Sequence, residues 1–537
     1  MNSSLNSTHR ISNLEQASQE QYDLIVVGGG ITGSGIALDA ASRGMKVLLL
    51  DKQDFAAGTS SRSTKLIHGG LRYLKQLNFG LVRQVGRERA ILYQNASYLV
   101  YPEKLLLPIY KSGSLGFAST SFALWFYDLL AGVQKKERRK MLSKEQAIQE
   151  ESMLIHEGLL GAGIYYEYRT DDARLTLEVL KTAVNYGANA FNYLELNDFI
   201  ESKGQITGVK TTDLIRGASY EFSAKYVVNA TGPWVDQLRK KNSEKLDKHL
   251  YLTKGVHLVV SHKKFPINHS MYFDVPDGRM VFAVKRDDKV YLGTTDTEYH
   301  ENLEEPICTK EDMDYLLKAT NAMFPKLHLT SADIDSSWAG LRPLIHEKGK
   351  LPSEISRKDE IFEAKNGLIS IAGGKLTAYR KMAQKVVDQI VKKEKRFGKC
   401  KTDAILLSGT IAKGEEAYKS MRLRLKKYEA KFHSEKQLIK LLHTYGAACF
   451  TMLDNVEDLM ALFFAEIDYC IENEALEYLA DYYARRSAKV LFSVDEMDHT
   501  QEQVLKYYAL KKNLSENEIQ VEKERIAQLK KETLLKF

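Results

Sequence analysis

Short apolar, β-branched runs recur through the first two thirds of the chain, separated by turns and by stretches with helical spacing. Each run is five or six residues long, which suits a buried strand better than a buried helix. They are DLIVV (23–27), KVLLL (46–50), YVVNA (226–230), VHLVV (256–260), KVYLG (289–293) and GLISIA (367–372). Strands that alternate with helical stretches predict an α/β chain, and the later runs predict an added sheet.

The pattern changes near residue 400. All nine prolines lie before Ser353, and only Gly409, Gly414 and Gly446 follow Asp403. Because these breakers are scarce, the last part of the chain is predicted to be helical. Residues 1–21 are polar, so we expect a flexible leader there, an α/β part over 22–400 and a helical C-terminal domain over 401–537.

The first strand runs directly into a glycine-rich turn. Gly28, Gly30 and Gly33 form the pattern G-x-G-x-x-G, which a helical stretch follows. These glycines suit a tight turn, close approach of a pyrophosphate and helix-on-strand packing. Asp51 ends the next strand, where a carboxylate can accept the ribose hydroxyls. The pattern predicts dinucleotide binding, with a glycine turn in a ligand-free protein as the alternative, and it does not separate NAD from FAD.

Two later segments favour FAD. Thr231 and Gly232 follow the strand YVVNA, and GLISIAGGKLTAYRKMA (367–383) is a second strand, Gly-Gly turn and helix, with Gly374, Leu376 and Thr377 in the turn. This second helix start would place partial positive charge beside the flavin ring and stabilise its anionic reduced form. A nicotinamide enzyme does not need that charge. Two ordinary strand-to-helix turns are the alternative.

Charge and cysteine content narrow the class further. The 77 basic and 70 acidic residues give a net charge of +7, too small an excess to indicate nucleic acid binding but suited to anionic substrates or an acidic lipid surface. The four cysteines are scattered, so neither disulfides nor a metal site are indicated and a cytoplasmic location is expected. The most apolar stretch, Leu115 to Leu130, is too short and too polar to cross a membrane.

Several longer segments identify a family. The sequence resembles the FAD-dependent glycerol-3-phosphate dehydrogenases, the respiratory branch of a family that also holds the α-glycerophosphate oxidases. The resemblance covers roughly residues 20 to 520 and rests on GTSSRSTKLIHGGLRYL (58–74), YYEYRTDDARL (165–175), NATGPWVD (229–236), KGVHLVV (254–260), LGTTDTEY (292–299), WAGLRPL (338–344), GGKLTAYRKMA (373–383) and LEYLADYYARRSAKVLF (476–492).

The resemblance implies a fold. It is an α/β FAD-binding domain of the glutathione-reductase/amine-oxidase type, with an added antiparallel-sheet substrate domain and an all-α C-terminal domain. The FAD-binding and substrate-binding domains would then be interleaved over residues 22–400.

The resemblance also implies site residues. The flavin contacts would be Ser60, Ser61, Ser63, Thr64 and Leu66, and the substrate pocket would hold Arg72, Tyr73, Arg342, Arg357 and Lys375. Arginine and lysine suit a phosphomonoester, which carries close to two negative charges near neutral pH. For each cation taken alone, a solvated surface charge or an ion-pair partner is the favoured alternative, because the sequence does not show that these residues converge.

The predicted reaction is oxidation of sn-glycerol 3-phosphate to dihydroxyacetone phosphate, which requires a base for the C2 hydroxyl. We predict His68 as that base because imidazole is neutral and basic near pH 7, with a structural hydrogen bond as its alternative role. Arg342 would hold the alkoxide, and Lys375 and Arg72 would bind the phosphate or hydroxyls.

The electron acceptor is open between membrane quinone, which we favour, and dioxygen, which would make the protein an oxidase that produces hydrogen peroxide. The oxidases known to us carry an insertion that this chain lacks. The rival classes are a flavin oxidase of amines or amino acids and a non-catalytic flavoprotein.

Quinone as acceptor implies peripheral contact with the inner face of the cell membrane. Two segments, 104–125 and 419–432, are candidates for that contact, and packing on the protein itself is the alternative for both. The segment with Tyr482, Tyr483, Arg485 and Arg486 is predicted to form a packing or subunit surface, or to meet lipid. A homodimer is expected.

Overall fold

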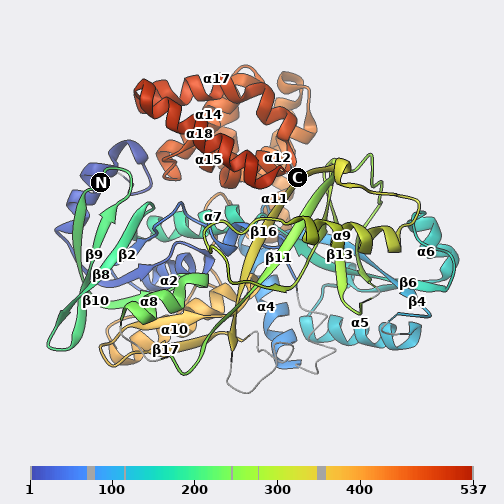
Figure 1. Ribbon diagram of the computed structural model, residues 1–537, viewed down its shortest axis with the longest axis horizontal. Coiled ribbons are helices and arrows are strands. Elements are labelled where there is room, and N and C mark those ends of the chain that lie inside the picture. Colours follow the sequence, from blue (N-terminus) through green and yellow to red (C-terminus); the bar gives the residue numbers. More distant parts are fainter. Residues whose placement is uncertain are drawn as a thin grey trace.

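The computed structural model describes residues 3–68, 79–113, 116–242, 246–275, 277–346 and 358–534. Figure 1 shows two sheets side by side, with the C-terminal helices grouped above them. Arg72, Tyr73 and Arg357 lie outside the described residues, and so do the predictions made for them.

The first sheet has a parallel centre. Its strand order is β17-β18-β10-β1-β2-β7, with β8 and β9 extending it from β10. Neighbouring strands from β18 to β7 pair in parallel, while β17 pairs antiparallel to β18. The bounds are β1 Gln21–Val27, β2 Val47–Leu50, β7 Asn189–Phe191, β8 Leu194–Ser202, β9 Gln205–Asp213, β10 Ser219–Asn229, β17 Glu360–Glu363 and β18 Ile369–Ala372.

Helices cover the parallel strands. They are α2 (Ile31–Ser42), α7 (Asp172–Asn185) and α10 (Tyr379–Lys393), and α2 packs against both of the others. Eleven of the twelve residues of α2 are buried, because it is sandwiched between neighbours, and its sequence is accordingly small and apolar on all sides.

The second sheet is antiparallel except for one parallel pair, β4 with β12. Helices α4 (Phe79–Asn95), α5 (Phe117–Ala131), α6 (Lys144–Glu150), α8 (Val235–Lys241) and α9 (Lys310–Met323) surround the sheets. Its strands are β3 Leu66–Ile67, β4 Tyr101–Tyr110, β5 Lys140–Leu142, β6 Leu159–Arg169, β11 His249–Ser261, β12 Ser270–Asp274, β13 Met280–Arg286, β14 Lys289–Gly293, β15 Thr297–Glu298 and β16 Ile334–His346. The α/β architecture predicted from the sequence, with its added antiparallel sheet, is confirmed.

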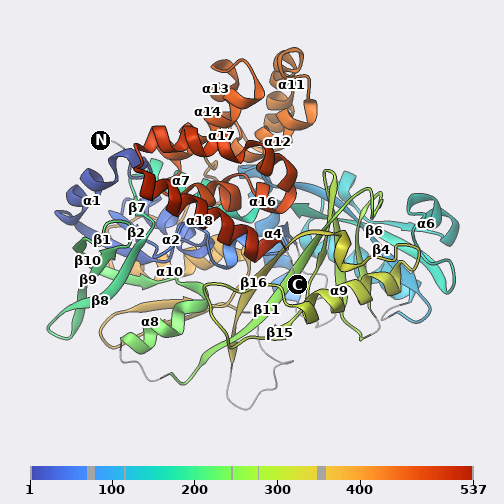
Figure 2. The ribbon, with the colours of Figure 1, turned by 45° about the horizontal axis from the view of Figure 1, so that its top comes forward.

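The C-terminal part is helical, as predicted. One cluster of buried apolar side chains runs from Leu24 of β1 to Tyr508 and Ile526 near the C-terminus, so these helices share a core with the first sheet (Figure 2). The division into domains at residue 400 stays a prediction. The elements are α11 Gly414–Phe432, α12 Glu435–Tyr445, α13 Ala448–Asp454, α14 Leu459–Asn473, α15 Leu479–Asp481, the π-helical turn η8 Tyr482–Arg486, α16 Lys489–Phe492, α17 Val494–Lys512 and α18 Glu516–Thr533.

The expectation of a flexible leader over residues 1–21 is wrong for its described part. A 3-10 turn, η1 (Ser7–His9), leads into helix α1 (Arg10–Ser18). Leu14 is fully buried, and the buried Arg10 pairs with Asp213 at 3.0 Å. This segment is ordered because its few apolar residues pack on the first sheet. Its polar composition does not reveal that such a surface is available.

The two membrane candidates differ. The seam of α11 formed by Met421, Leu425, Tyr428 and Phe432 is buried, with at most 5% of each residue exposed, so that face packs on the protein itself. The other candidate begins as buried strand β4 and ends in α5, where Phe122 and Trp125 are exposed. Among the described residues, no helix combines the length and the apolar character that crossing a membrane requires.

Candidate functional site

The glycine-rich turn after β1 lies against backbone on two sides. Gly28 has φ +111°, and a Cβ there would lie 2.6 Å from the Ala230 carbonyl oxygen. A Cβ on Gly33 would lie 1.8 Å from the Gly28 carbonyl oxygen. Only glycine fits these positions, so the turn brings the N-terminus of α2 close to the end of β1. The start of a helix carries partial positive charge, which suits a pyrophosphate.

Asp51 closes the next strand and binds the same turn. Its Oδ2 accepts a hydrogen bond from Gly29 N at 2.6 Å, and its Oδ1 accepts one from Gln53 N at 2.8 Å. Burial raises the pKa of Asp51 to about 6, although these two N–H groups act to lower it. The two hydrogen bonds place the Asp51 carboxyl group at the edge of the glycine-rich turn, where the sequence predicts an acid for the ribose hydroxyls.

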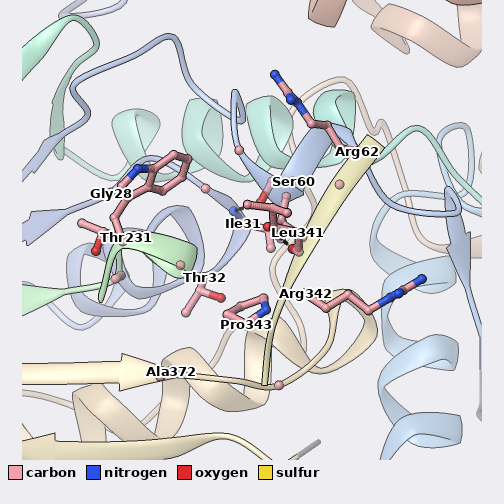
Figure 3. A pocket seen from close by; sticks show the side chains of 18 of the residues that line it. Gly28, Ile31, Thr32, Ser60, Arg62, Thr231, Leu341, Arg342, Pro343 and Ala372 are labelled. Carbon is pink, nitrogen blue, oxygen red and sulfur yellow. Dashed lines mark hydrogen bonds between the residues drawn. The ribbon is translucent and has the colours of Figure 1, made fainter. Parts of the chain in front are cut away.

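A cavity of about 500 Å³ runs along the turn. Figure 3 shows Gly28 and Thr231 on one side and Arg342 on the other, with Ile31, Thr32 and Ser60 between them. The Ser60 hydroxyl accepts a hydrogen bond from Ile31 N at 2.9 Å, which ties the Thr59–Ser61 segment to the start of α2. The cavity is thus walled by segments that are distant in the sequence.

Most of the predicted site residues line this cavity. Gly33 and Ser61 do not: Gly33 packs under the turn, and the carbonyl of Ser61 accepts from Lys65 Nζ at 2.9 Å. Their assigned roles stay predictions. The lining includes Gly28, Gly30, Asp51, Ser60, Ser63, Thr64, Leu66, His68, Thr231, Gly232, Arg342, Gly374, Lys375, Leu376 and Thr377.

Arg342 reaches the cavity from β16. Its guanidinium donates to Thr294 Oγ1 at 2.9 Å and pairs with Asp296 at 2.9 Å. About a quarter of the side chain is exposed. A Cβ at Gly255 would lie 2.3 Å from Arg342 Nη2, so the neighbouring strand β11 gives the guanidinium room by having glycine there. The fork is held in place before any anion binds.

The comparison with known proteins decides the family. Residues 23–380 match the family described as FAD dependent oxidoreductase. The chain belongs to this family. The "Aerobic glycerol-3-phosphate dehydrogenase" of Bacillus subtilis strain 168 is 50% identical over 510 residues, which are 92% of this chain and 92% of that protein. The family resemblance and the cofactor, FAD, both predicted from the sequence motifs, are confirmed.

Solved structures agree. The structure of the glycerol-3-phosphate dehydrogenase from Bacillus halodurans complexed with FAD has a TM-score of 0.85 and 39% identity, and the match covers 99% of this chain and 100% of that one. Glycine oxidase from Geobacillus kaustophilus has a TM-score of 0.53 at 20% identity, over 71% of this chain and 97% of that one. The second likeness shows a shared fold alone.

The described residues of this FAD dependent oxidoreductase fit the cofactor. Gly28 and Gly30 line the cavity without side chains, so the backbone of the turn can approach a pyrophosphate closely. Gly373 and Gly374, with φ of +75° and +84°, lead through a short turn into α10 and line the cavity. This second helix start is where the sequence predicted positive charge for the flavin ring.

His257 lies in the motif KGVHLVV (254–260) but was not predicted as a site residue. It lines the cavity from β11, lies 3.0 Å from Thr64 Oγ1 through Nε2, and stacks on Trp338 with 4.6 Å between ring centroids. Burial, followed by the charges of Arg342 and Lys65, holds the pKa of His257 well below its ordinary value. In the part of the chain that the structure describes, its Nδ1 has no hydrogen-bond partner.

Two further lining residues, Trp234 and Lys52, were also missed. Trp234 Nε1 donates to Glu304 at 2.9 Å, and Lys52 Nζ pairs with the same carboxylate at 2.5 Å. Lys52 also lies 5.1 Å from the centre of the Trp234 ring. Trp234 lies inside the quoted motif NATGPWVD (229–236), and Lys52 directly follows Asp51. Neither position by itself indicates a role.

Proposed function

We propose that this flavoprotein oxidises the C2 hydroxyl of sn-glycerol 3-phosphate to the carbonyl of dihydroxyacetone phosphate. The observation that carries the proposal is the 50% identity, along 92% of both chains, with the aerobic glycerol-3-phosphate dehydrogenase of Bacillus subtilis. The cavity supports this proposal because Arg342 and Lys375 bring positive charge to it, and His68 and His257 line the same cavity.

Bound FAD would supply the acceptor for the hydride that leaves C2. Arg342 would bind the developing alkoxide or the phosphate, because a guanidinium fork pairs with oxyanions through two parallel hydrogen bonds. Lys375, at the second glycine turn, would bind the other of these groups. Its place beside the start of α10 adds to the positive potential that attracts a dianionic substrate.

The base is proposed from two histidines. His68 keeps its place as the first candidate: it lines the cavity, and its carbonyl accepts from Thr377 Oγ1 at 3.4 Å. His257 is the second, because it lines the same cavity and its Nδ1 has no partner among the described residues. Burial holds the pKa of His257 well below its ordinary value, which makes its imidazole a weak base and places it after His68. The variants His68→Gln and His257→Gln distinguish the two candidate bases. Loss of the base should abolish flavin reduction by glycerol 3-phosphate at pH 7 and weaken the dependence of the reduction rate on pH.

We further propose membrane quinone as the electron acceptor, with the protein on the cytoplasmic side and in peripheral contact with the bilayer. Helix α5 supports this contact. Phe122, Trp125 and Leu129 are spaced along one face of it and are 63%, 48% and 63% exposed. Figure 1 shows α5 at the lower edge of the molecule, away from the C-terminal helices. Aromatic and apolar residues on an exposed helix face suit the interface of a bilayer.

The segment that follows α5 carries positive charge. Lys135, Lys136, Arg138 and Lys140 are exposed, whereas Glu137 turns inward and accepts from Tyr168 Oη at 2.8 Å. Basic residues beside an apolar helix face complement anionic lipid headgroups. The expected homodimer stays a prediction, as does the choice of quinone over dioxygen.

The test is anaerobic reduction. Purified protein is mixed with glycerol 3-phosphate without oxygen, and the flavin absorbance near its visible maximum is followed. Loss of the flavin absorbance supports glycerol 3-phosphate as the substrate. Glycerol at equal concentration serves as the control that lacks the phosphate. Readmitting air or a soluble quinone then separates the acceptors, because rapid recovery in air with peroxide formed would identify an oxidase. A flavin that stays oxidised contradicts the proposal.

A matched pair of variants tests the pocket. Arg342→Met should lower kcat/KM for glycerol 3-phosphate by roughly tenfold to a hundredfold, the loss expected for a charge-assisted hydrogen bond. Arg279→Met is the control, because Arg279 pairs with Asp277 at 2.6 Å and does not line the cavity; it should leave kcat/KM near the wild-type value. Equal losses in both variants would contradict the role proposed for Arg342 in binding the substrate.

A further inference from the structure

The paired arginines of the C-terminal part point into the protein. Arg485 and Arg486 end the π-helical turn η8, and the Arg486 side chain is fully buried. Of the alternatives predicted for this segment, packing within the protein is the one that the structure shows, and contact of these arginines with lipid or with another subunit is not. A π-helical turn reorients the side chains that follow it, and here it directs two cations toward the first sheet.

Both arginines bind one carboxylate, Asp54. Arg485 Nε donates to Asp54 Oδ2 at 2.5 Å, and Arg486 Nη2 donates to Asp54 Oδ1 at 2.8 Å, with a second contact from Arg486 Nη1 to Oδ2. Asn192 Nδ2 adds a hydrogen bond to Oδ1 at 3.0 Å. Arg486 also donates to the Glu474 carbonyl at 2.7 Å. Asp54 is thus saturated with donors, most of them from the C-terminal part.

Asp54 belongs to the loop that forms one wall of the cavity. The loop runs from Asp51 to Ala57, and Asp51, Lys52 and Ala57 line the cavity. Ala56 N donates to the Gly29 carbonyl at 3.1 Å, and a Cβ on Gly29 would lie 2.5 Å from Phe55. Any shift of Asp54 therefore moves both the glycine turn and the ribose-binding acid.

The charges at this contact are costly to bury. Although burial acts to raise it, the charges of Arg486 and Arg485 hold the pKa of Asp54 below its ordinary value, so the carboxylate is ionised and paired. A buried ion pair contributes little net stability compared with apolar packing, but loss of one partner leaves an uncompensated charge. Such a contact fixes a conformation more than it adds stability.

We propose that the C-terminal helices retain the cofactor: Arg485 and Arg486 hold Asp54, and through it position Asp51 and the Gly29 backbone for the adenosine end of FAD. The two arginines are positioning residues, since they act through Asp54 and do not line the cavity themselves. The proposal rests on FAD binding and on neither the substrate nor the acceptor.

The test compares affinity with stability. Apoprotein of Arg485→Met and of Arg486→Met is titrated with FAD and separately with ADP, which has the adenosine and pyrophosphate but no flavin ring. Both dissociation constants should rise by the same factor, roughly tenfold to a hundredfold, the range typical of coupling between two sites. The melting temperature of each apoprotein is recorded alongside.

Lys181→Met is the matched control. Lys181 is also buried at the contact with the C-terminal helices, where it binds Glu178 at 3.0 Å and Glu474 at 3.1 Å, but it does not touch the loop or line the cavity. It should lower the melting temperature without changing either dissociation constant. The proposal is overturned when the control weakens FAD and ADP as much as the arginine variants do, or when those variants keep wild-type affinity.

A second measurement uses the unmutated protein, in case the arginine variants do not fold. Coupling is reciprocal, so ADP or FAD added to apoprotein should slow amide hydrogen exchange in residues 482–487 as well as in 51–57. Slowing confined to the cavity walls would contradict the proposal. Because neither experiment uses glycerol 3-phosphate, a failure here is distinguishable from a failure of the proposed reaction.

Discussion

Helices α5 and α11 each overlap a segment that was a candidate for membrane contact, but the structure uses them in opposite ways. Helix α5 is apolar along most of its length with one charged residue, Asp128, whereas α11 carries an apolar seam among many charged residues. In α11 the apolar seam is covered, and Leu425 is 3% exposed. In α5, Leu129 is 63% exposed and forms a face with Phe122 and Trp125. Amphipathic spacing marks a face that gains from leaving water, but whether the protein or another phase covers it depends on the neighbouring elements.

The neighbours of α11 explain its burial. Helix α12 packs along it, Tyr428 stacks near Phe450, and the Tyr428 hydroxyl donates to Asp454. Among the described residues, helix α5 is covered on the side of Leu124 and Tyr127, which are fully buried, and Tyr127 Oη donates to Glu167 at 3.0 Å. Apolar residues at helical spacing are therefore core in one helix and partly surface in the other.

The largest expected effect is on stability. Leu425→Ala in α11 should lower the free energy of unfolding by roughly 2–5 kcal/mol, because a fully buried leucine leaves a cavity. Leu129→Ala in α5 should change it by less than about 0.5 kcal/mol, as for other exposed sites. Urea unfolding of both variants measures the difference. Equal losses would show that α5 is also covered in solution and would remove the contrast.

The next effect is on vesicle binding. Phe122→Ser or Trp125→Ser should weaken binding to vesicles of anionic phospholipid by roughly tenfold to a hundredfold, since each side chain contributes about 1.5–3 kcal/mol when it leaves water. Leu423→Ser is the control, because Leu423 is 67% exposed on α11. Flotation of each variant with vesicles measures binding. A control as defective as the α5 variants would contradict the assignment of the face.

A smaller effect is expected from the basic segment after α5. Neutralising Lys135 or Lys140 with glutamine should weaken binding to anionic vesicles by roughly fivefold each, from about 1 kcal/mol per basic residue near an anionic surface. Binding should also fall as salt rises. Vesicles of neutral phosphatidylcholine serve as the comparison, and unchanged binding of the variants to anionic vesicles would leave the aromatic face as the sole contact.

The smallest expected effect is on the pH dependence of stability. The hydrogen bond from Tyr428, followed by Lys427 and Arg424, lowers the pKa of Asp454. A lowered folded pKa means that the stabilisation is present above the ordinary carboxyl pKa of about 4 and is lost as pH falls through the folded value. The attachment of α11 should therefore weaken below about pH 4, and Asp454→Asn should remove that part of the pH dependence. Unfolding curves measured from pH 6 to pH 3 test this.

The sequence by itself determined what depends on neighbours in the chain. Gly28, Gly30 and Gly33 with Asp51 announce a nucleotide turn, because the conformations that such a turn needs are available to few residue types. Scarcity of proline and glycine after residue 403 likewise indicates helices, since helix formation is a local property. Family motifs then implied further site residues, and most of the predicted site residues that the structure describes line the cavity.

The tertiary structure alone decided which side chains leave water and which charges meet. Arg10 looked like part of a loose leader, and Arg486 looked like a surface charge, yet Asp213 and Asp54 bury them from more than 200 and 400 residues away. His257 becomes neutral because β11 carries it into the cavity. Burial and pairing are sums over distant segments, so sequence spacing identifies a face or a charge but not what will cover it.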